Sequence, residues 1–340
     1  MKDSPLALLT GASGFVGGKI TERLLREGRR VRAYARRPLP GLAALGVEVV
    51  LGDLNDEAAM RRACTGATTV FHVAARVGVW GPEKEFRRVN IEGTAALLAA
   101  AREAGVERFV YTSSPSVVYS GGNLRGIDES APLCTAAPCA YPTSKAEAER
   151  LVAAANSQGM RTVSLRPHLV WGPGDHHLVP RILALARSGR LRIVGDGENR
   201  VDLTHIDNVV AAHLLAERAL ATPGAAAAGR AYFITNGDPV ALWPWINNLL
   251  VRLGEKPIHR RLSLRRAATA GAICEALWTL LPLRGEPPMT RFAAKELATD
   301  HWFSIEAARR DLAYSPQVSM AAGLEDYLAG LQGSATALPS

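Results

Sequence analysis

The stretch LALLTGASGFVGGKI, residues 6–20, decides the fold of this chain. A short apolar run, Leu6–Leu9, ends in a turn whose glycines lie three residues apart, at Gly11, Gly14 and Gly17, and a helical pattern follows. Glycines at such a junction let the backbone turn tightly and approach a pyrophosphate, while the N-terminus of the helix favours the anion. A lone glycine triplet is a weak signal, but here the strand and the helix are both present. The turn therefore predicts a dinucleotide-binding site.

Strand-like and helix-like segments alternate along the first half of the chain. The strand-like segments are short, mostly apolar and rich in β-branched residues, which is typical of a parallel sheet buried on both faces. The predicted strands are Leu6–Leu9, Val31–Tyr34, Val47–Leu51, Thr69–Val73, Phe109–Tyr111 and Thr162–Leu165. This alternation predicts an α/β fold with a doubly wound parallel sheet of the Rossmann type.

The alternation becomes less regular after residue 173. We expect residues 1–173 to form the dinucleotide-binding domain, and residues 201–240 to return to it through a helix and a strand. Residues 174–200 and 241–330 are expected to form a smaller C-terminal substrate-binding or lid region. Residues 331–340 are expected to be a disordered tail.

Composition and charge exclude several classes of protein. The net charge is +8, but the positive residues occur in separate groups without interleaved aromatic residues, which argues against a nucleic-acid partner. The four cysteines show no metal-binding spacing, so we expect no metal site and free thiols in a reducing compartment. The first apolar run is four residues long, which is too short for a signal peptide, so the expected location is the cytoplasm.

A second apolar segment, residues 267–283, follows a basic stretch and contains one acidic residue, Glu275. A membrane-spanning helix needs about 20 apolar residues, so this segment is too short to span. Two interpretations stay open, a buried helix or substrate lid, and a helix that makes peripheral membrane contact.

The segment YPTSK places Tyr141 and Lys145 four residues apart at the start of a predicted helix, where they share a face. Upstream, the strand that ends in TSSPS supplies serines. A tyrosine, with an ordinary pKa of about 10, can act as an acid or base near neutral pH if a nearby positive charge stabilises its phenolate. A serine hydroxyl can polarise the substrate oxygen. The spacing of tyrosine and lysine alone is common, and its meaning depends on the glycine turn before it.

The choice of nicotinamide cofactor is expected to depend on the end of the second strand. A carboxylate there would bind the ribose 2′-hydroxyl of NAD, but this chain has Ala35 followed by Arg36 and Arg37. Two guanidinium groups can hold a 2′-phosphate. We therefore predict NADP(H), with NAD(H) as the second choice and a solvated basic turn as the alternative reading of the arginines.

Several further motifs occur in the order found in the extended short-chain dehydrogenases/reductases, which the chain resembles. They are GDL at 52–54, HVAA at 72–75, Asn90, and RPHLVWGPGD at 166–175. The segments FHVAARVGVWG, YTSSPSVVY, VGDGENRVDLTHIDN and CEALWTLLPLRGEPPMTRF are similar to the 3β-hydroxysteroid dehydrogenase branch of that family. Within the branch, nearly the whole chain most resembles the bacterial 2-alkyl-3-oxoalkanoate reductases of long-chain olefin biosynthesis.

The resemblance implies a set of site residues. The catalytic residues would be Tyr141, Lys145 and Ser114, with Ser113 as the alternative serine, and Asn90 would support their geometry. The residues implied in cofactor binding are Gly11, Ser13, Gly14, Phe15, Val16, Gly17, Arg36, Arg37, Asp53, Leu54, Ala74, Ala75, Asn90, Tyr141, Lys145, Pro167, Leu169 and Val170.

The resemblance also implies the reaction, the NADPH-dependent reduction of the 3-oxo group of a bulky lipid β-keto acid. The alternatives are a 3β-hydroxysteroid or 4-carboxysterol 3-dehydrogenase, a nucleotide-sugar epimerase or dehydratase, and a non-enzymatic NADP-binding protein. The expected substrate contacts are Val79, Trp80, Ser116, His168 and Trp171, with core packing as the alternative for the aromatic residues, and His177 and Arg200 are weaker candidates for a substrate carboxylate. A homodimer or a multienzyme assembly is expected.

Overall fold

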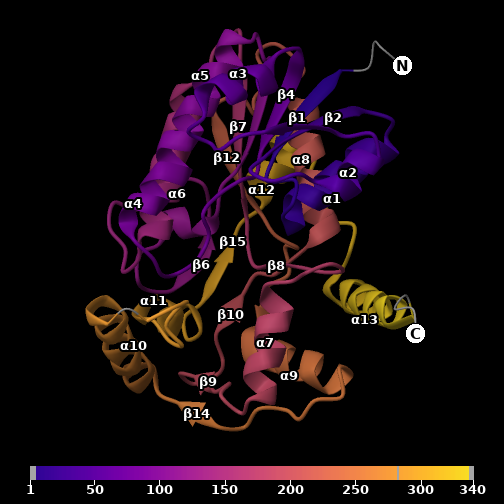
Figure 1. The fold of residues 1–340 in the computed structure, drawn as a ribbon. Coiled ribbons are helices and arrows are strands. Elements are labelled where there is room, and N and C mark those ends of the chain that lie inside the picture. The colour runs from indigo at the N-terminus through magenta and orange to yellow at the C-terminus, as the bar shows by residue number, and fades with distance from the viewer. Residues whose placement is uncertain (1–4, 282, 337–340) are drawn as a thin grey trace.

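A seven-stranded parallel sheet is the centre of the computed structural model, which describes residues 5–281 and 283–336 (Figure 1). The strand order is β12-β7-β5-β4-β1-β2-β3, and every neighbouring pair is parallel. The strands are β1 (Leu6–Thr10), β2 (Arg30–Ala35), β3 (Glu48–Leu51), β4 (Ala67–His72), β5 (Arg108–Thr112), β7 (Arg161–Pro167) and β12 (Arg230–Ile234). All six predicted strands are present, and the predicted fold class is confirmed.

Helices cover both faces of this sheet. Successive side chains of a strand point to opposite faces, so Ala7 and Leu9 of β1 enter one apolar core and Leu6 and Leu8 enter the other. The first core includes side chains of α1 (Phe15–Arg26), α8 (Ile206–Ala219) and α12 (Glu306–Leu312). The second includes side chains of α3 (Glu57–Cys64), α5 (Gly93–Glu103) and α6 (Ala140–Ala154). Burial on both faces explains why the strands read as continuous apolar runs.

The order of the strands reverses between β1 and β4. From β1 the chain proceeds outward to β2 and β3, and it then returns to β4 on the other side of β1. In open parallel sheets, ligands bind in the crevice beyond the carboxyl ends of the strands at such a reversal. The glycine turn after β1 and the HVAA segment at the end of β4 lie at this point.

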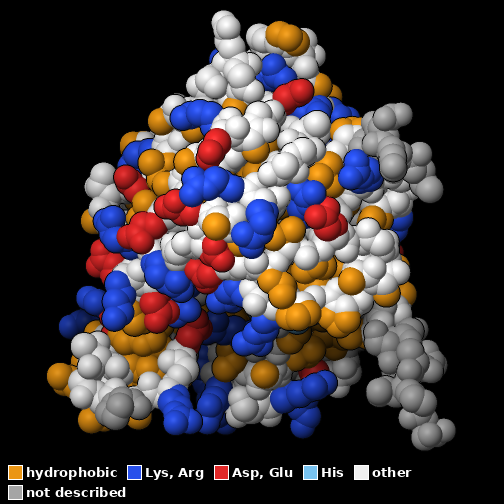
Figure 2. Space-filling view, turned by 45° about the horizontal axis from the view of Figure 1, so that its top comes forward, with side chains coloured by type: hydrophobic (Ala, Val, Ile, Leu, Met, Phe, Trp, Pro, Cys, Tyr) orange, Lys and Arg blue, Asp and Glu red, His pale blue; other side chains and the backbone are white. Residues whose placement is uncertain are grey.

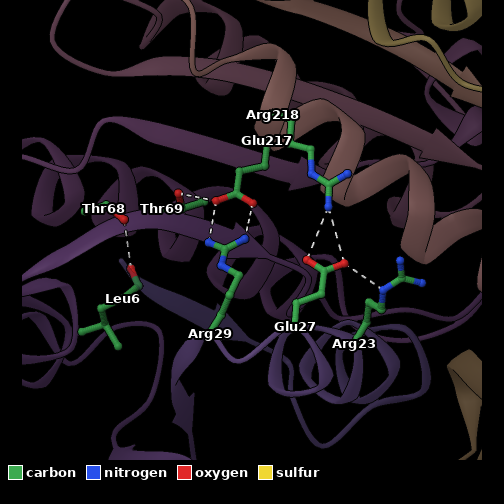
Figure 3. A network of polar contacts seen from close by, with 8 residues as sticks. All are labelled: Leu6, Arg23, Glu27, Arg29, Thr68, Thr69, Glu217 and Arg218. Carbon is green, nitrogen blue, oxygen red and sulfur yellow. Dashed lines mark hydrogen bonds and ion pairs between the residues drawn. The ribbon is translucent and has the colours of Figure 1, made fainter. Parts of the chain in front are cut away.

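A polar network fixes α8 to the sheet (Figure 3). Arg29, which precedes β2, donates to both carboxylate oxygens of Glu217 in α8, with its Nη2 lying 2.7 Å from Oε1. Thr69 of β4 donates to the same carboxylate at 2.7 Å. A nearly buried carboxylate thus receives three hydrogen bonds, so its charge is compensated.

The rest of the chain forms a smaller region below the sheet in the view of Figure 1. Four short strands, in the order β13-β10-β15-β6, connect it to the sheet. The strands are β13 (Val240–Ala241), β10 (Arg200–Val201), β15 (His301–Phe303) and β6 (Leu124–Ile127), and two further pairs join β8 (Val170–Trp171) to β11 (Thr204–His205) and β9 (Ile193–Val194) to β14 (Arg261–Leu262). The helices are α7 (Leu178–Arg187), α9 (Leu242–Arg252), α10 (Leu264–Leu280) and α11 (Arg291–Glu296).

The structure differs from three of the sequence-based expectations. Residues 305–314, expected in the substrate-binding region, contribute Ile305, Leu312 and Tyr314 to a core of the large sheet, because α12 packs on that sheet. The expected tail from residue 331 is helical as far as Thr336 in α13 (Met320–Thr336), and residues 337–340 lie outside the described residues.

The third difference concerns α10, which is not a buried helix. It ends at Leu280, and its buried side chains are confined to one stripe, Ala267, Gly271 and Glu275. Among the described residues, no helix is long and apolar enough to cross a membrane.

Candidate active site

The glycine turn closes tightly at the carboxyl end of β1. Gly11 has a φ of +76°, and a Cβ there would lie 2.7 Å from the backbone nitrogen of Ala74. A Cβ on Gly17 would collide with the carbonyl oxygen of Gly11. Helix α1 begins after Gly14, no side chain of the described residues caps it, and its first turn, which includes Phe15 and Val16, has no acidic residue. The free N–H groups of this helix end fit a pyrophosphate.

The two arginines after β2 are free of acidic partners. Arg36 and Arg37 are exposed, and within the described ranges neither makes an ion pair. Asp53, which follows β3, accepts a hydrogen bond from the side chain of Asn55 at 2.9 Å and pairs with Arg88 at 3.1 Å. Leu54, the next residue, packs against Gly93. These residues lie at the carboxyl edge of the sheet, where the adenosine half of a dinucleotide is expected.

Asn90 connects the HVAA segment to the start of α6. It lies in a π-helical turn, η1 (Arg87–Glu92), that precedes α5, and such turns are frequent at functional sites. Its Oδ1 accepts from the backbone of Arg76 at 2.7 Å, and its Nδ2 donates to Oγ of Ser144 at 3.0 Å. Ser144 in turn donates to the carbonyl of Tyr141 at 2.9 Å. Asn90 thus fixes the segment after Ala74 and Ala75 relative to the first turn of α6.

Tyr141, Ser114 and Lys145 lie together at the start of α6. Burial raises the pKa of Tyr141, and a hydrogen bond with Ser114 partly offsets that rise. Lys145, one turn further along the helix, is 2% exposed, donates to the carbonyl of Thr112 at 2.7 Å and lies 4.1 Å above the ring of Tyr111. Burial lowers the pKa of Lys145 to about 7. A phenol, an aliphatic hydroxyl and an amine with a lowered pKa therefore share one location.

The structure distinguishes the two candidate serines. Ser113 donates to Oε2 of the buried Glu149 at 2.5 Å, and Glu149 also forms a two-point ion pair with Arg166. Ser114 instead accepts hydrogen bonds from the backbone and the hydroxyl of Ser116, at 3.2 and 3.0 Å. Ser113 is thus engaged with a buried ion pair, whereas Ser114 hydrogen-bonds to Ser116 and to Tyr141.

A cavity of about 650 Å³ opens beside the first turn of α6. Val79 and Trp80, both expected as substrate contacts, line one side of it. The segment from Cys134 to Ala140, which directly precedes Tyr141, also lines it, whereas Tyr141, Ser114 and Lys145 themselves do not. Its remaining lining residues are Gly81, Glu83, Phe86, Arg87, Ile91, Thr143, Ser144, Glu147 and Arg150.

Two of the expected substrate contacts are core residues instead. Trp171 is fully buried and meets the ring of Trp245 edge-on at 5.2 Å, because the pairing of β8 with β11 directs it into the core of the smaller region. His168 is buried, its Nε2 lies 2.7 Å from Nδ1 of His301, and burial holds the pKa of His168 well below its usual value. Neither lines the cavity beside α6.

The turn that carries these two residues has an unusual backbone. Pro167 ends β7, Val170 begins β8, and Leu169 between them has a φ of +38°. A non-glycine residue in this region of φ is uncommon, and such residues concentrate at ligand-binding sites. The turn lies at the carboxyl end of β7, on the same edge of the sheet as the glycine turn.

Neither residue suggested for a substrate carboxylate lines the cavity. His177 immediately precedes α7, and the Arg200 guanidinium donates to the carbonyl of Pro239. A different group, which the sequence did not reveal, has an unsatisfied hydroxyl among the described residues. Tyr119, whose ring lies 5.1 Å from that of Phe292, has a buried hydroxyl without a hydrogen-bond partner among the described residues. In the sequence, the only feature that could have pointed to Tyr119 was its position three residues after Ser116.

One group of side chains has the composition of a metal site. The potential ligand atoms of His205, Asp207 and Asp326 lie within 4.8 Å of one another, but both carboxylates are exposed, and exposed acidic groups are common without an ion. This group is separate from the residues around Tyr141, and it supports no metal role in the site described above.

Comparisons with known proteins identify the family of the chain. The model of the 3-beta hydroxysteroid dehydrogenase/isomerase family matches residues 8–265. A 2-alkyl-3-oxoalkanoate reductase of Stenotrophomonas maltophilia (strain K279a) is 47% identical over 93% of this chain and 96% of its own length. A 3-beta-hydroxysteroid dehydrogenase of Mycolicibacterium neoaurum is 35% identical over 91% of this chain and 86% of its own length.

Among solved structures, MoeE5 in complex with UDP-glucose and NAD is similar, with a TM-score of 0.75, 26% identity and coverage of 97% of this chain and 99% of that one. The family match spans most of the chain, and the relatives align along nearly all of it. The expected family is confirmed, and a nicotinamide cofactor is supported. The chain belongs to the 3-beta hydroxysteroid dehydrogenase/isomerase family, a branch of the extended short-chain dehydrogenases/reductases, and is an NAD(P)-dependent oxidoreductase.

Proposed function

We propose that this protein reduces the 3-oxo group of a 2-alkyl-3-oxoalkanoate, a bulky lipid β-keto acid, to the 3-hydroxy acid with NADPH. The observation that carries the proposal is the hydrogen bond between Tyr141 and Ser114, with the buried Lys145 one turn further along α6. The cavity with Val79 and Trp80 on its wall is lined by Ala140, which directly precedes Tyr141, and not by these three side chains. The choice of substrate class is supported by the relative at 47% identity, which is named for this reaction.

When bound, NADPH supplies the hydride. Tyr141 donates its phenolic proton to the 3-oxygen, and its raised pKa keeps it protonated at neutral pH, the form that reduction requires. The Ser114 hydroxyl donates a hydrogen bond to the same oxygen, where negative charge develops. Lys145, when protonated, stabilises the phenolate that remains on Tyr141.

The preference for NADP(H) is proposed from the end of β2. Arg36 and Arg37 are exposed there without acidic partners among the described residues, and no carboxylate at this end of the strand would repel a 2′-phosphate. Arginine binds phosphate through two parallel hydrogen bonds, which gives both affinity and orientation.

A carboxylate on the substrate would be recognised by Lys295 and Tyr119. Lys295 Nζ lies 3.1 Å and Tyr119 Oη 3.7 Å from the point that a Cβ on Gly121 would occupy. Lys295 makes no ion pair within the part of the chain that the structure describes. Burial raises the pKa of the neighbouring Glu296. A cation and a hydroxyl without a hydrogen-bond partner among the described residues therefore both lie within 4 Å of one point beside Gly121.

This assignment can be tested with an ester. Lys295→Met is expected to raise the KM for a 2-alkyl-3-oxo acid by roughly tenfold, in line with the loss of one charged hydrogen bond. The KM for the methyl ester of the same compound is expected to stay within about twofold, because the ester carries no charge. An equal change for acid and ester would remove Lys295 from this role.

The second candidate reaction is the oxidation of a 3β-hydroxysteroid. It is supported by the relative at 35% identity that is named for it. The deciding experiment uses one preparation of the enzyme and two assays, NADPH oxidation with a long-chain 2-alkyl-3-oxo acid and NAD(P)+ reduction with 3β-hydroxysterols. We expect turnover in the first assay. Turnover of the sterol alone would replace our proposal with the second candidate.

A further inference from the structure

The outer face of α10 and the segment after it expose an apolar surface. Large hydrophobic side chains here are Ile273 at 57% exposed, Leu277 at 42%, Leu280 at 80%, Leu281 at 49% and Leu283 at 43%. Half of the large hydrophobic side chains that are exposed in the described chain belong to this one stretch. Figure 2 shows hydrophobic side chains gathered at the lower left, near the position of α10 in Figure 1, with Lys and Arg side chains beside them. A concentration of this kind marks a binding surface.

The orientation of α10 on the protein is fixed. A Cβ on Gly271 would lie 2.6 Å from the backbone of Thr290, so the helix packs directly on the chain that leads into α11. Glu275 accepts hydrogen bonds from the backbone and the guanidinium of Arg291, at 2.7 and 2.6 Å. With this side held, Ile273, Leu277 and Leu280, spaced three and four residues apart, face outward together.

Positive charge surrounds this surface. Residues 255–291 contain seven Lys and Arg but only three Asp and Glu. All three acidic residues are already paired with arginines: Glu255 with Arg187, Glu275 with Arg291, and Glu286 with Arg181. The exposed Arg265 and Arg266 at the start of α10, and Arg284 after its end, have no ion pair among the described residues.

We propose that α10 docks the protein on the surface of an anionic lipid bilayer. The helix would lie in the plane of the interface, with Ile273, Leu277 and Leu280 among the acyl chains and the arginines at the level of the headgroups. At 17 residues, it is about 25 Å long, which suits a helix lying in the interface. This inference does not depend on which substrate the enzyme reduces.

A second copy of the chain fits this surface less well. In a symmetric dimer, two copies of α10 would meet through the same face, and the arginines of both copies would have to be accommodated in one interface. The acidic residues nearby are already paired, so the arginines would find no counter-charge there, whereas anionic headgroups provide one.

The test is flotation of the full chain with phosphatidylcholine vesicles, with and without phosphatidylglycerol. We expect binding to vesicles that contain phosphatidylglycerol, and weaker binding as salt increases. The triple variant Ile273→Ser, Leu277→Ser and Leu280→Ser should bind roughly tenfold less or weaker still, because it loses its buried apolar contacts. The matched control, Leu45→Ser with Val251→Ser, alters exposed apolar residues elsewhere and should bind as the wild type does.

A second variant separates charge from apolar insertion. Arg265→Gln with Arg266→Gln should reduce the difference between the two kinds of vesicle while circular dichroism stays unchanged. The proposal is overturned if the wild type does not bind the anionic vesicles, or if the triple variant binds them equally well. It is also overturned if the wild type binds no vesicle and is a dimer by light scattering that the triple variant converts to a monomer.

Discussion

The two regions of this molecule differ in what their surfaces are built to contact. At the carboxyl edge of the large sheet, the side chains around the catalytic unit have buried partners: Asn90 is held by Arg76 and Ser144, and Ser113 by Glu149. The smaller region has strands of two to four residues and leaves the outer face of α10 exposed and apolar. The first region holds a reactive geometry, for which rigidity is needed. The second exposes an apolar surface on α10 with arginines beside it, and this surface is available to a binding partner outside the protein.

Removing the acid/base group should give the largest effect. Tyr141→Phe is expected to lower kcat by about 10²- to 10⁴-fold, because it removes the phenolic proton while retaining the ring. NADPH affinity, followed by cofactor fluorescence, should stay within about twofold, since the glycine turn and Lys145 remain. If Tyr141→Phe keeps most of its activity, Tyr141 does not supply the proton to the substrate oxygen.

The buried ion pair behind the site should matter for stability. Glu149→Gln leaves the Arg166 charge uncompensated in the core, and we expect the free energy of unfolding to fall by about 3–5 kcal/mol. Glu147→Gln, two residues away in the same helix, breaks the exposed pair with Arg150 and should cost no more than about 1 kcal/mol. Denaturant unfolding of the two variants measures this contrast, and equal losses would mean that the burial of Glu149 is not what gives the pair its importance.

Cofactor preference should respond to the end of β2. Arg36→Ala with Arg37→Ala is expected to lower the ratio of NADPH to NADH affinity by roughly 10- to 100-fold, the value of one or two charged hydrogen bonds to a 2′-phosphate. Arg61→Ala, an exposed arginine on α3 that pairs with Glu57 and Glu103, is the control and should leave the ratio unchanged. An unchanged ratio of NADPH to NADH affinity in the double variant would show that Arg36 and Arg37 belong to a solvated basic turn and do not bind the 2′-phosphate.

The smallest effect is a pH dependence from Lys145. Its pKa is lowered by burial from 10.5 to about 7 in the folded protein, so the unfolded chain keeps this proton to higher pH. The cost of the buried charge is therefore fully present below pH 7 and disappears as the pH rises from about 7 to 10.5. Lys145→Met should gain stability over the wild type mainly at and below neutral pH.

The measurement is the difference in Tm between Lys145→Met and the cofactor-free wild type across that pH range. We expect the difference to shrink by a few degrees as the pH rises. Lys256→Met, at an exposed position, should show a flat difference. A flat difference for Lys145→Met as well would show that its amine keeps an ordinary pKa in the fold.

The sequence alone determined the sheet and the glycine turn at its edge. Close backbone approaches require Gly11 and Gly17. The helical pattern places Lys145 one turn after Tyr141, but the spacing of this pair became informative only together with the glycine turn. The same patterns predicted all six strands that were proposed for the sheet, because a strand buried on both faces must be apolar throughout.

The tertiary structure decided what depends on distant partners. Ser113 and Ser114 are adjacent in sequence, and only Glu149 and Arg166, folded against one of them, separate their roles. Trp171 and His168 lie in a motif that suggested substrate contact, but their directions are set by Trp245 and His301, more than seventy residues away along the chain. For α10, the sequence left two interpretations open, a buried helix or substrate lid and a helix that makes peripheral membrane contact. Packing through Gly271 and Glu275 fixed which side faces outward, because a helix that is apolar all round has no preferred side until a neighbour covers one.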